Sequence, residues 1–386
     1  MNMVTILRVV GASIAAAASL AATQAQAQAQ AEIPSEWVLC NNEDRAYPPE
    51  IVIDGCAAVL RSDWPPHERA VAYTNRGLAY YRSTGALDRA KADYDAAIKL
   101  DPSYVPAFNN RATVYRDMRD FDRAIADYDE AIRLDPENAA VLTNRGAVWQ
   151  DKGELDRAIS DYDAAIRINP RYAAAFTNRG NTYRQKGDLD RAAADYGAAI
   201  EADPTNAVAY NNRGAAYRIK GDDEKALVYY SEAIRLDPKY ALAFNNRGSV
   251  RYAKGELDLA VADFNEAIRL NPRFVAAIAN RGDTYRDKGE FERAVMDYDE
   301  VIKLNSRNPI TWNNRGLAHL KLGNLDQSIR DYDAALRINP NLASALYGRS
   351  LAKRKRGDEA GAEGDLAAAT AIRPDVAEEF TKFGIE

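Results

Sequence analysis

Histidine and cysteine are almost absent from this chain of 386 residues, since each occurs only twice. His67 and His319 are therefore the only side chains that ordinarily exchange protons near neutral pH. The sequence also lacks a glycine-rich phosphate loop, a nucleophile elbow and any clustered spacing of metal ligands. We accordingly expect no enzyme activity, no cofactor and no metal site.

A strong charge of one sign is also missing, as are long apolar runs. The formal net charge is -6, and charged residues of both signs make up 28% of the chain, which argues against a nucleic-acid binder. Beyond Ala22, no apolar run approaches the roughly 20 residues that a membrane-spanning helix needs. We expect no nucleic-acid partner and no membrane span.

The apolar stretch that does exist lies at the N-terminus, from Val9 to Ala22. An alanine- and glutamine-rich segment follows and offers several Ala-x-Ala cleavage sites, the last ending at Ala31. This order of segments is typical of a secretory signal peptide. We expect residues 1–31 to be removed and the mature chain to be periplasmic or secreted. The alternative is a cytosolic protein with an apolar N-terminal anchor.

The two cysteines, Cys40 and Cys56, both follow this N-terminal segment. In an oxidising compartment, a nearby pair is typical of a structural disulfide. Two cysteines without neighbouring histidines make a poor metal site. We therefore expect a disulfide that stabilises a capping segment over residues 32–69.

Proline recurs along the rest of the chain with a period of 34 residues. The series is Pro102, Pro136, Pro170, Pro204, Pro238, Pro272, Pro340 and Pro374, with Ser306 in the one missing place. Within each period, one helical stretch ends at a glycine and a second ends just before the proline position, which predicts a helical hairpin. Nine such units cover residues 70–376, and the first carries an insertion between Arg76 and Gly85.

Residue types recur at fixed positions within each unit, as the count from Ala207 illustrates. Position four is large and apolar, eight is usually glycine, eleven aromatic, twenty alanine, twenty-four tyrosine or phenylalanine, and twenty-seven alanine. This pattern resembles the tetratricopeptide repeat. The resemblance implies an all-α fold, a right-handed α-α superhelix of stacked helical hairpins with a concave groove. We expect the position-eight glycines to approach the position-twenty alanines, and residues 377–386 to form a C-terminal capping helix.

Asparagine occupies position six in nearly every unit. The residues are Asn110, Asn144, Asn178, Asn212, Asn246, Asn280 and Asn314, with Asn75 in the shifted first unit. Position six faces away from the glycine side of its helix, and the resemblance places that face in the groove. The row is similar to the asparagine ladder of the O-linked N-acetylglucosamine transferase superhelix. Because an amide both donates and accepts, such a row can pair with the main chain of an extended peptide.

Other polar residues are expected to line the same groove. They are Asn211 and Asn245 at position five, and Arg184 and Arg218 at position twelve. The lysines that a chaperone-type carboxylate clamp requires at positions two and five are absent. The alternative for the asparagines is that they face solvent or form hydrogen bonds within the molecule.

Arginine at position seven departs from the aliphatic residue usual in the family, and it falls on the packed side of its helix. An unpaired charge is costly there. Aspartate recurs at position twenty-three of every unit except the fifth, which has Tyr229. We expect a structural ladder of arginine and aspartate between packed helices.

The pattern as a whole favours a non-enzymatic scaffold that binds a protein or an extended peptide along an asparagine-lined groove. Two alternatives remain open at this point. The chain could be an architectural envelope protein that self-associates, or an accessory subunit of an envelope enzyme.

Overall fold

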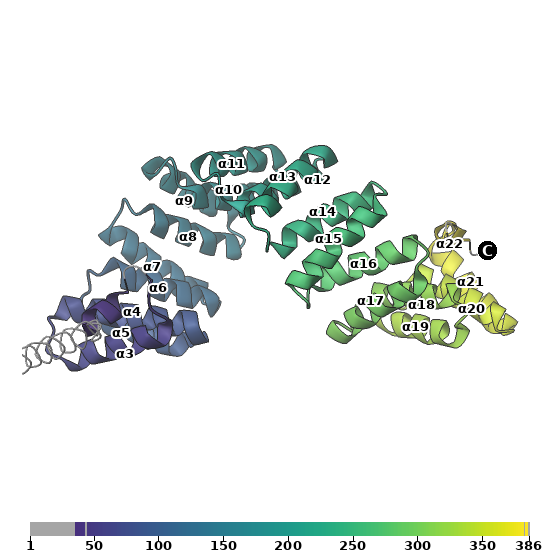
Figure 1. Ribbon diagram of the computed structural model, residues 1–386, viewed down its shortest axis with the longest axis horizontal. Coiled ribbons are helices and arrows are strands. Elements are labelled where there is room, and N and C mark those ends of the chain that lie inside the picture. Colours follow the sequence, from purple (N-terminus) through teal and green to yellow (C-terminus); the bar gives the residue numbers. More distant parts are fainter. Residues whose placement is uncertain (1–34, 43–44, 382, 385–386) are drawn as a thin grey trace, which may run out of the picture. The chain divides into compact units, whose positions relative to one another are not determined.

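The computed structural model describes residues 35–42, 45–381 and 383–384. The predicted signal peptide, residues 1–31, lies outside this range. Every secondary-structure element of the described residues is a helix, and consecutive helices pack as hairpins (Figure 1). The prediction of an all-α repeat fold is therefore confirmed. None of the described helices combines the length and apolar character that crossing a bilayer requires.

Nine hairpins follow one another from α4 to α21. Their first helices are α4 (Pro66–Thr84), α6 (Val105–Asp117), α8 (Ala139–Asp151), α10 (Ala173–Gln185), α12 (Ala207–Ile219), α14 (Ala241–Ala253), α16 (Val275–Asp287), α18 (Pro309–Lys321) and α20 (Ala343–Lys355). Their second helices are α5 (Leu87–Leu100), α7 (Phe121–Leu134), α9 (Leu155–Ile168), α11 (Leu189–Ala202), α13 (Asp223–Leu236), α15 (Leu257–Leu270), α17 (Phe291–Leu304), α19 (Leu325–Ile338) and α21 (Glu359–Ile372). α4 is longer than the other first helices because it begins at Pro66, before the repeat, and contains the insertion predicted between Arg76 and Gly85.

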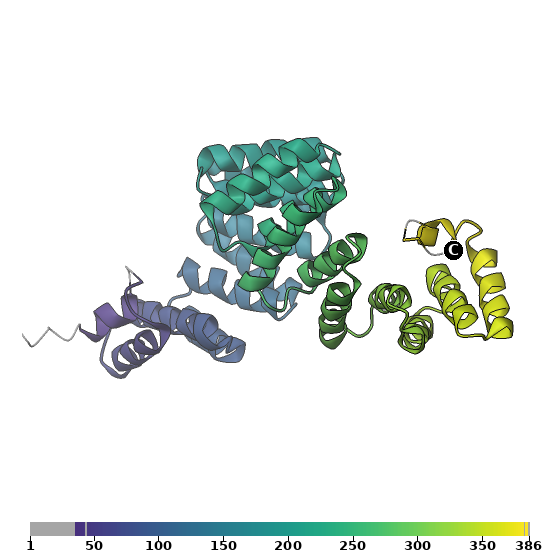
Figure 2. The same ribbon diagram turned by 45° about the vertical axis from the view of Figure 1, so that its right-hand side comes forward.

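The chain divides into two compact units, one ending at Ile168 and one beginning at Asn169. The first contains the hairpins from α4 to α9, and the second contains those from α10 to α21. Within the second unit, the second helix of each hairpin packs against the first helix of the next. Figure 2 shows α10 to α13, drawn in teal, in successive layers.

The turn between the two helices of a hairpin requires a left-handed backbone residue. Gly221 has a φ of 82°, which glycine adopts without steric cost. Asp222 follows it, and its carboxylate accepts a hydrogen bond from the Lys225 N–H, which caps α13. In the second repeat Arg119 occupies the turn position with a φ of 61°, a conformation that costs a residue with a side chain about 1–2 kcal/mol.

Tyrosine and phenylalanine at position twenty-four fill the centre of each hairpin. Tyr230 is 1% exposed, and a Cβ on Gly214 would lie only 2.9 Å from its Cε1. The aromatic ring, rather than the position-twenty alanine Ala226, therefore occupies the space that the missing side chain leaves. We expected the glycine to approach the alanine side chain directly, and this expectation was incomplete. The atom of Ala226 nearest to a Cβ on Gly214 is the carbonyl oxygen, at 3.3 Å.

The N-terminal cap consists of α2 (Glu36–Asn41) and α3 (Pro49–Arg61). Cys40 and Cys56 form a disulfide that joins the two helices, which confirms the predicted pairing. α3 packs against α4 and covers the first repeat.

The structure describes residues 377–381 and 383–384 of the predicted C-terminal capping segment, 377–386. Its described helix is α22 (Glu378–Thr381), in which Phe380 is 2% exposed. The Phe380 ring lies 4.9 Å from the ring of Tyr347 in α20, and Val376 is buried in the same apolar cluster, so both side chains cover the last repeat.

Candidate functional site

The position-six asparagines lie on the first helices, and their amides connect neighbouring repeats. Asn246 Nδ2 donates to Asn211 Oδ1 of the preceding repeat at 3.0 Å. Asn280 Nδ2 donates in the same way to Asn245 Oδ1 at 3.1 Å. In the first unit, Asn144 Nδ2 donates to the Oδ1 atom of Asn109 at 2.9 Å. The row is thus an asparagine ladder between first helices.

In two repeats whose preceding repeat lacks asparagine at position five, position nine of the preceding repeat accepts instead. Asn212 Nδ2 donates to Asn181 Oδ1 at 3.1 Å, and Asn314 Nδ2 donates to Asp283 Oδ1 at 2.9 Å. The same Asp283 oxygen accepts the hydroxyl of Tyr298 at 2.7 Å. Burial raises the pKa of Tyr298 well above its usual value, so the hydroxyl remains a donor at neutral pH.

These bonds assign different roles to the two asparagine positions. Asn211 is 2% exposed and Asn245 is 7% exposed, so neither can contact a ligand in the groove as we expected. Both lie beneath the surface as acceptors, because the first helices of adjacent repeats approach closely enough to bury position five. The position-six side chains, in contrast, are only partly buried.

Each position-six amide retains capacity for a ligand. An amide has two N–H groups and two lone pairs, and the ladder bond of Asn246 uses one N–H group. Asn110 accepts a hydrogen bond from Asn109 at 3.1 Å. The side chain of Asn178 has no hydrogen-bond partner within its own unit, among the described residues. Internal hydrogen bonding, the alternative, therefore occurs along most of the row, but each amide keeps donors or acceptors for a ligand. Asn280 keeps only its carbonyl oxygen, because its Nδ2 donates to both Asn245 and Ser249.

Arg184 and Arg218, the predicted groove arginines, lie in α10 and α12 of the second unit. Neither forms an ion pair with any residue that the structure describes. The equivalent Arg116 instead pairs with Asp151 at 2.6 Å, and Arg286 pairs with Asp287 at 2.8 Å. Two consecutive repeats thus carry position-twelve guanidinium groups without an ion-pair partner among the described residues.

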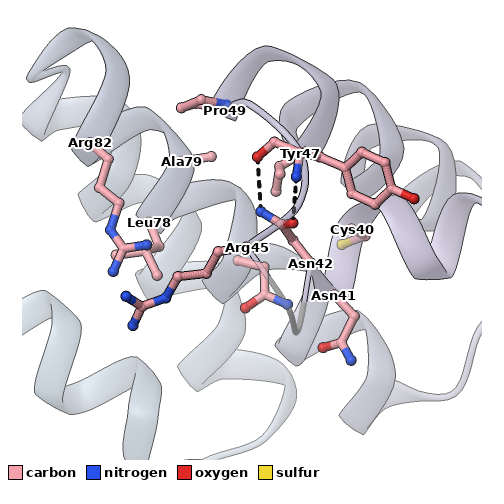
Figure 3. Close-up of a pocket in the computed structure, with 11 residues that line it drawn as sticks. Cys40, Asn41, Asn42, Arg45, Tyr47, Pro49, Leu78, Ala79 and Arg82 are labelled. Carbon is pink, nitrogen blue, oxygen red and sulfur yellow. Dashed lines mark hydrogen bonds between the residues drawn. The ribbon is translucent and has the colours of Figure 1, made fainter.

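A surface pocket lies between the N-terminal cap and α4 (Figure 3). Asn42 organises one wall, because its Nδ2 donates to the Tyr47 carbonyl at 3.1 Å and its Oδ1 accepts from the Tyr47 N–H at 3.0 Å. Asn75 and Arg82 of α4 also line the pocket. Arg82 and Arg45 direct their guanidinium groups to the same side of it (Figure 3). The asparagine-bearing face of the first repeat therefore continues, at Asn75, into a pocket at the cap.

The predicted arginine–aspartate ladder is confirmed on the side of the first helices that packs on the second helices. The pairs are Arg76–Asp93, Arg111–Asp127, Arg145–Asp161, Arg179–Asp195, Arg247–Asp263, Arg281–Asp297, Arg315–Asp331 and Arg349–Asp365, with N···O distances between 2.5 and 2.7 Å. In most repeats the arginine also donates to position twenty-five of the preceding repeat, as Arg315 does to Asp299. These contacts are structural.

The rare histidines occupy unrelated places. His67 hydrogen-bonds Asp101 at 2.7 Å, and His319 lies half-buried in α18, where burial lowers its pKa. No grouping of His, Cys, Asp and Glu suited to a metal ion occurs among the described residues.

Sequence reasoning missed the acceptors of the asparagine ladder. A signal was present, because Asn-Asn pairs recur at residues 109–110, 211–212, 245–246 and 313–314. Two amides at adjacent positions on one helix point about 100° apart. One can therefore face the neighbouring helix while the other faces the groove.

Family models match most of the chain. Models of the tetratricopeptide repeat match residues 70–104, 109–173, 161–194, 241–274 and 309–342. A further model, described as a TPR repeat, matches residues 180–218, 214–255 and 282–323. No curated protein matches the chain.

Solved structures share the fold. A tetratricopeptide repeat protein from Parabacteroides merdae is 19% identical over 64% of this chain and 98% of its own, with a TM-score of 0.50. One chain in the crystal structure of the APC/C hetero-tetramer Cut9-Hcn1 is 17% identical. The match covers 88% of this chain and 83% of that chain, also with a TM-score of 0.50. Repeats of this kind support a role in protein–protein interaction. The chain belongs to the tetratricopeptide repeat family.

Proposed function

We propose that this protein is an exported, non-enzymatic scaffold that holds an extended segment of a partner protein along the first-helix faces of its repeats. The observation that carries the proposal is the asparagine row at position six. Its amides are oriented by the ladder and are only partly buried. An extended main chain presents a donor and an acceptor in every residue, which matches such a row regardless of side chains.

The asparagine amides are held in a fixed orientation before any ligand binds, and this supports the proposed role. A free asparagine side chain loses rotamer freedom when it binds, and each immobilised side chain lowers affinity. The bond from Asn246 to Asn211 already fixes the amide, so the second N–H and the carbonyl oxygen are held in place for a ligand. A ladder that only stabilised the fold would not need its donors at a partly exposed position.

The residues around the row indicate what segment would fit. Val208, Leu242 and Ile310 occupy position two of their helices, one turn before the asparagine, and are 47%, 40% and 48% exposed. Arg184 and Arg218 add positive charge. An extended segment with apolar and acidic side chains therefore complements the second unit best.

Export is part of the proposal. The N-terminal sequence has the order of segments that a secretory signal peptide requires. The Cys40–Cys56 disulfide supports it independently, because disulfides persist mainly in oxidising compartments.

Replacement of Asn178, Asn212 and Asn246 together by alanine tests the binding face. We expect the recovery of partner proteins from an envelope extract to fall at least tenfold, because three consecutive amides are lost. The measurement is a pull-down quantified by mass spectrometry, with circular dichroism to confirm that the helices are retained.

A matched control replaces Leu259 and Met296, which are 49% and 69% exposed on second helices, by alanine. This variant should recover partners as the unchanged chain does. Equal recovery by the triple asparagine variant would refute the proposed binding face and favour an architectural, self-associating protein.

A further inference from the structure

The fifth repeat interrupts the arginine–aspartate ladder. At position twenty-three, where the other repeats have the aspartate that pairs with the position-seven arginine, the fifth repeat has Tyr229. At position twenty-five of the preceding repeat, where an aspartate, asparagine or serine is usual, the chain has Gly197. The position-seven arginine of the fifth repeat is Arg213. Both acceptors that hold the equivalent Arg315, Asp331 and Asp299, are therefore missing here.

The Arg213 guanidinium group is packed but not paired. Its carbon lies 4.8 Å from the centre of the Tyr229 ring. A Cβ on Gly197 would come within 3.2 Å of the same carbon, so the group lies directly against bare backbone. Its Nε is buried without a hydrogen-bond partner, and it forms no ion pair with any residue in the described part of the chain. A buried polar group in this state is costly.

An aromatic and apolar surface surrounds this arginine. Tyr217 stacks on Tyr229 with ring centres 5.4 Å apart, and Tyr210 lies 6.4 Å from the same ring. Tyr210 and Tyr229 continue into a shallow pocket with Leu227 and Val228, and Val228 is 66% exposed. The depression belongs entirely to α12 and α13 of the second unit.

The nearby polar groups of this pocket are already engaged. Both oxygens of Glu232 accept from Arg235, Oε1 from Nη2 at 2.6 Å and Oε2 from Nε at 2.9 Å. Ser231 accepts from Arg247 Nη1 at 3.2 Å. Neither therefore supplies Arg213 with the missing acceptor.

We propose that Arg213 binds the carboxylate of an acidic side chain of a partner protein, in the place of the aspartate that the fifth repeat lacks. Arg213 is only partly buried as a residue, and of its guanidinium nitrogens only Nε is both buried and unpaired. The two Nη groups suit a carboxylate because they can donate two parallel hydrogen bonds. The pocket beside it accepts an apolar side chain next to the acidic residue. This site lies on the second-helix side, away from the asparagine row, and is a second contact beyond the proposed groove.

Titration with the peptide acetyl-Leu-Asp-Leu-amide tests the site, with acetyl-Leu-Asn-Leu-amide as the matched control. The readout is the Arg213 Nε–Hε signal in the NMR spectrum of the chain with ¹⁵N-labelled arginine. The signal is assigned by its absence from Arg213→Gln. We expect a saturable shift with the aspartate peptide and at least a tenfold weaker response to the asparagine peptide.

Tyr229→Asp provides the decisive variant, because it restores the internal carboxylate. We expect it to raise the melting temperature and to weaken binding of the aspartate peptide at least tenfold. The proposal is overturned if the Arg213 signal does not shift, if both peptides shift it equally, or if Tyr229→Asp binds as well as the unchanged chain. It is also overturned if sedimentation shows self-association that Arg213→Gln abolishes, since the occupant is then a second copy of the chain.

Discussion

Arg281→Ala is expected to destabilise the second unit by about 3–5 kcal/mol, the range for removal of one partner from a buried ion pair. Asp297 is 5% exposed, and Arg281 Nε and Nη2 donate to its two oxygens at 2.8 and 2.6 Å. These hydrogen bonds raise the pKa of Arg281. Without the arginine, the carboxylate is buried with no counter-charge. Urea denaturation, with hydrogen exchange over α16 and α17, measures the loss.

Two controls separate the buried charge from simple loss of a side chain. Arg281→Met combined with Asp297→Leu removes both charges, and we expect it to recover most of the stability. Arg213→Ala removes the same residue type at the same position where no aspartate is left behind, so it should cost less than about 1 kcal/mol. If Arg281→Ala and Arg213→Ala cost the same, the ladder does not stabilise the fold as described.

Reduction of the Cys40–Cys56 disulfide is expected to cost about 3 kcal/mol, because the bond closes a loop with a sequence separation of 16. The effect should be local. α3 packs on α4, and in a repeat protein each element contacts only its neighbours. Hydrogen exchange should therefore accelerate in α2 to α4 and remain unchanged in α16 to α19.

The double variant Cys40→Ser with Cys56→Ser should reproduce the effect of reduction, and added reductant should then have no further effect. Acceleration of exchange throughout the chain would contradict a local cap. Unchanged exchange in α2 to α4 would show that the disulfide does not hold the cap in place.

Much of the fold was predictable because the repeat constrains it many times over. Eight of the nine units have glycine at the turn, and eight have proline after the second helix. Glycine adopts the left-handed turn without steric cost, and proline cannot continue a helix. The arginine–aspartate ladder was predictable for a similar reason. A charge on the packed side requires a partner, and aspartate is the residue that recurs with it.

The details of the candidate site were less accessible from sequence. Helical periodicity places an asparagine on a face, but it does not determine whether a neighbouring helix lies within hydrogen-bond distance. Asn211 and Asn212 are adjacent and chemically identical, yet one is buried and the other partly exposed. Likewise, periodicity placed Gly214 on the packed side without showing that Tyr230 fills the space beside it.

The fifth repeat departs from the arginine–aspartate pattern, and the consequence for Arg213 follows only from the structure. The sequence contains Tyr229 in place of aspartate, which by itself reads as a tolerated substitution. The structure adds that Gly197 removes the second acceptor and that the Arg213 Nε is left without a partner. Because both acceptors are missing and Nε is unpaired, we infer a candidate binding site at Arg213.

The central claim is that a partner segment lies along the first-helix faces, and site-specific photocrosslinking in the intact cell tests it most directly. A photoreactive residue would replace Val208 or Leu242 on first helices, or Leu259 or Met296 on second helices, all of which are at least 40% exposed. We predict that the first pair crosslinks to a common partner protein and that the second pair does not. Crosslinks from the second pair alone, or none from Val208 and Leu242, would contradict the account.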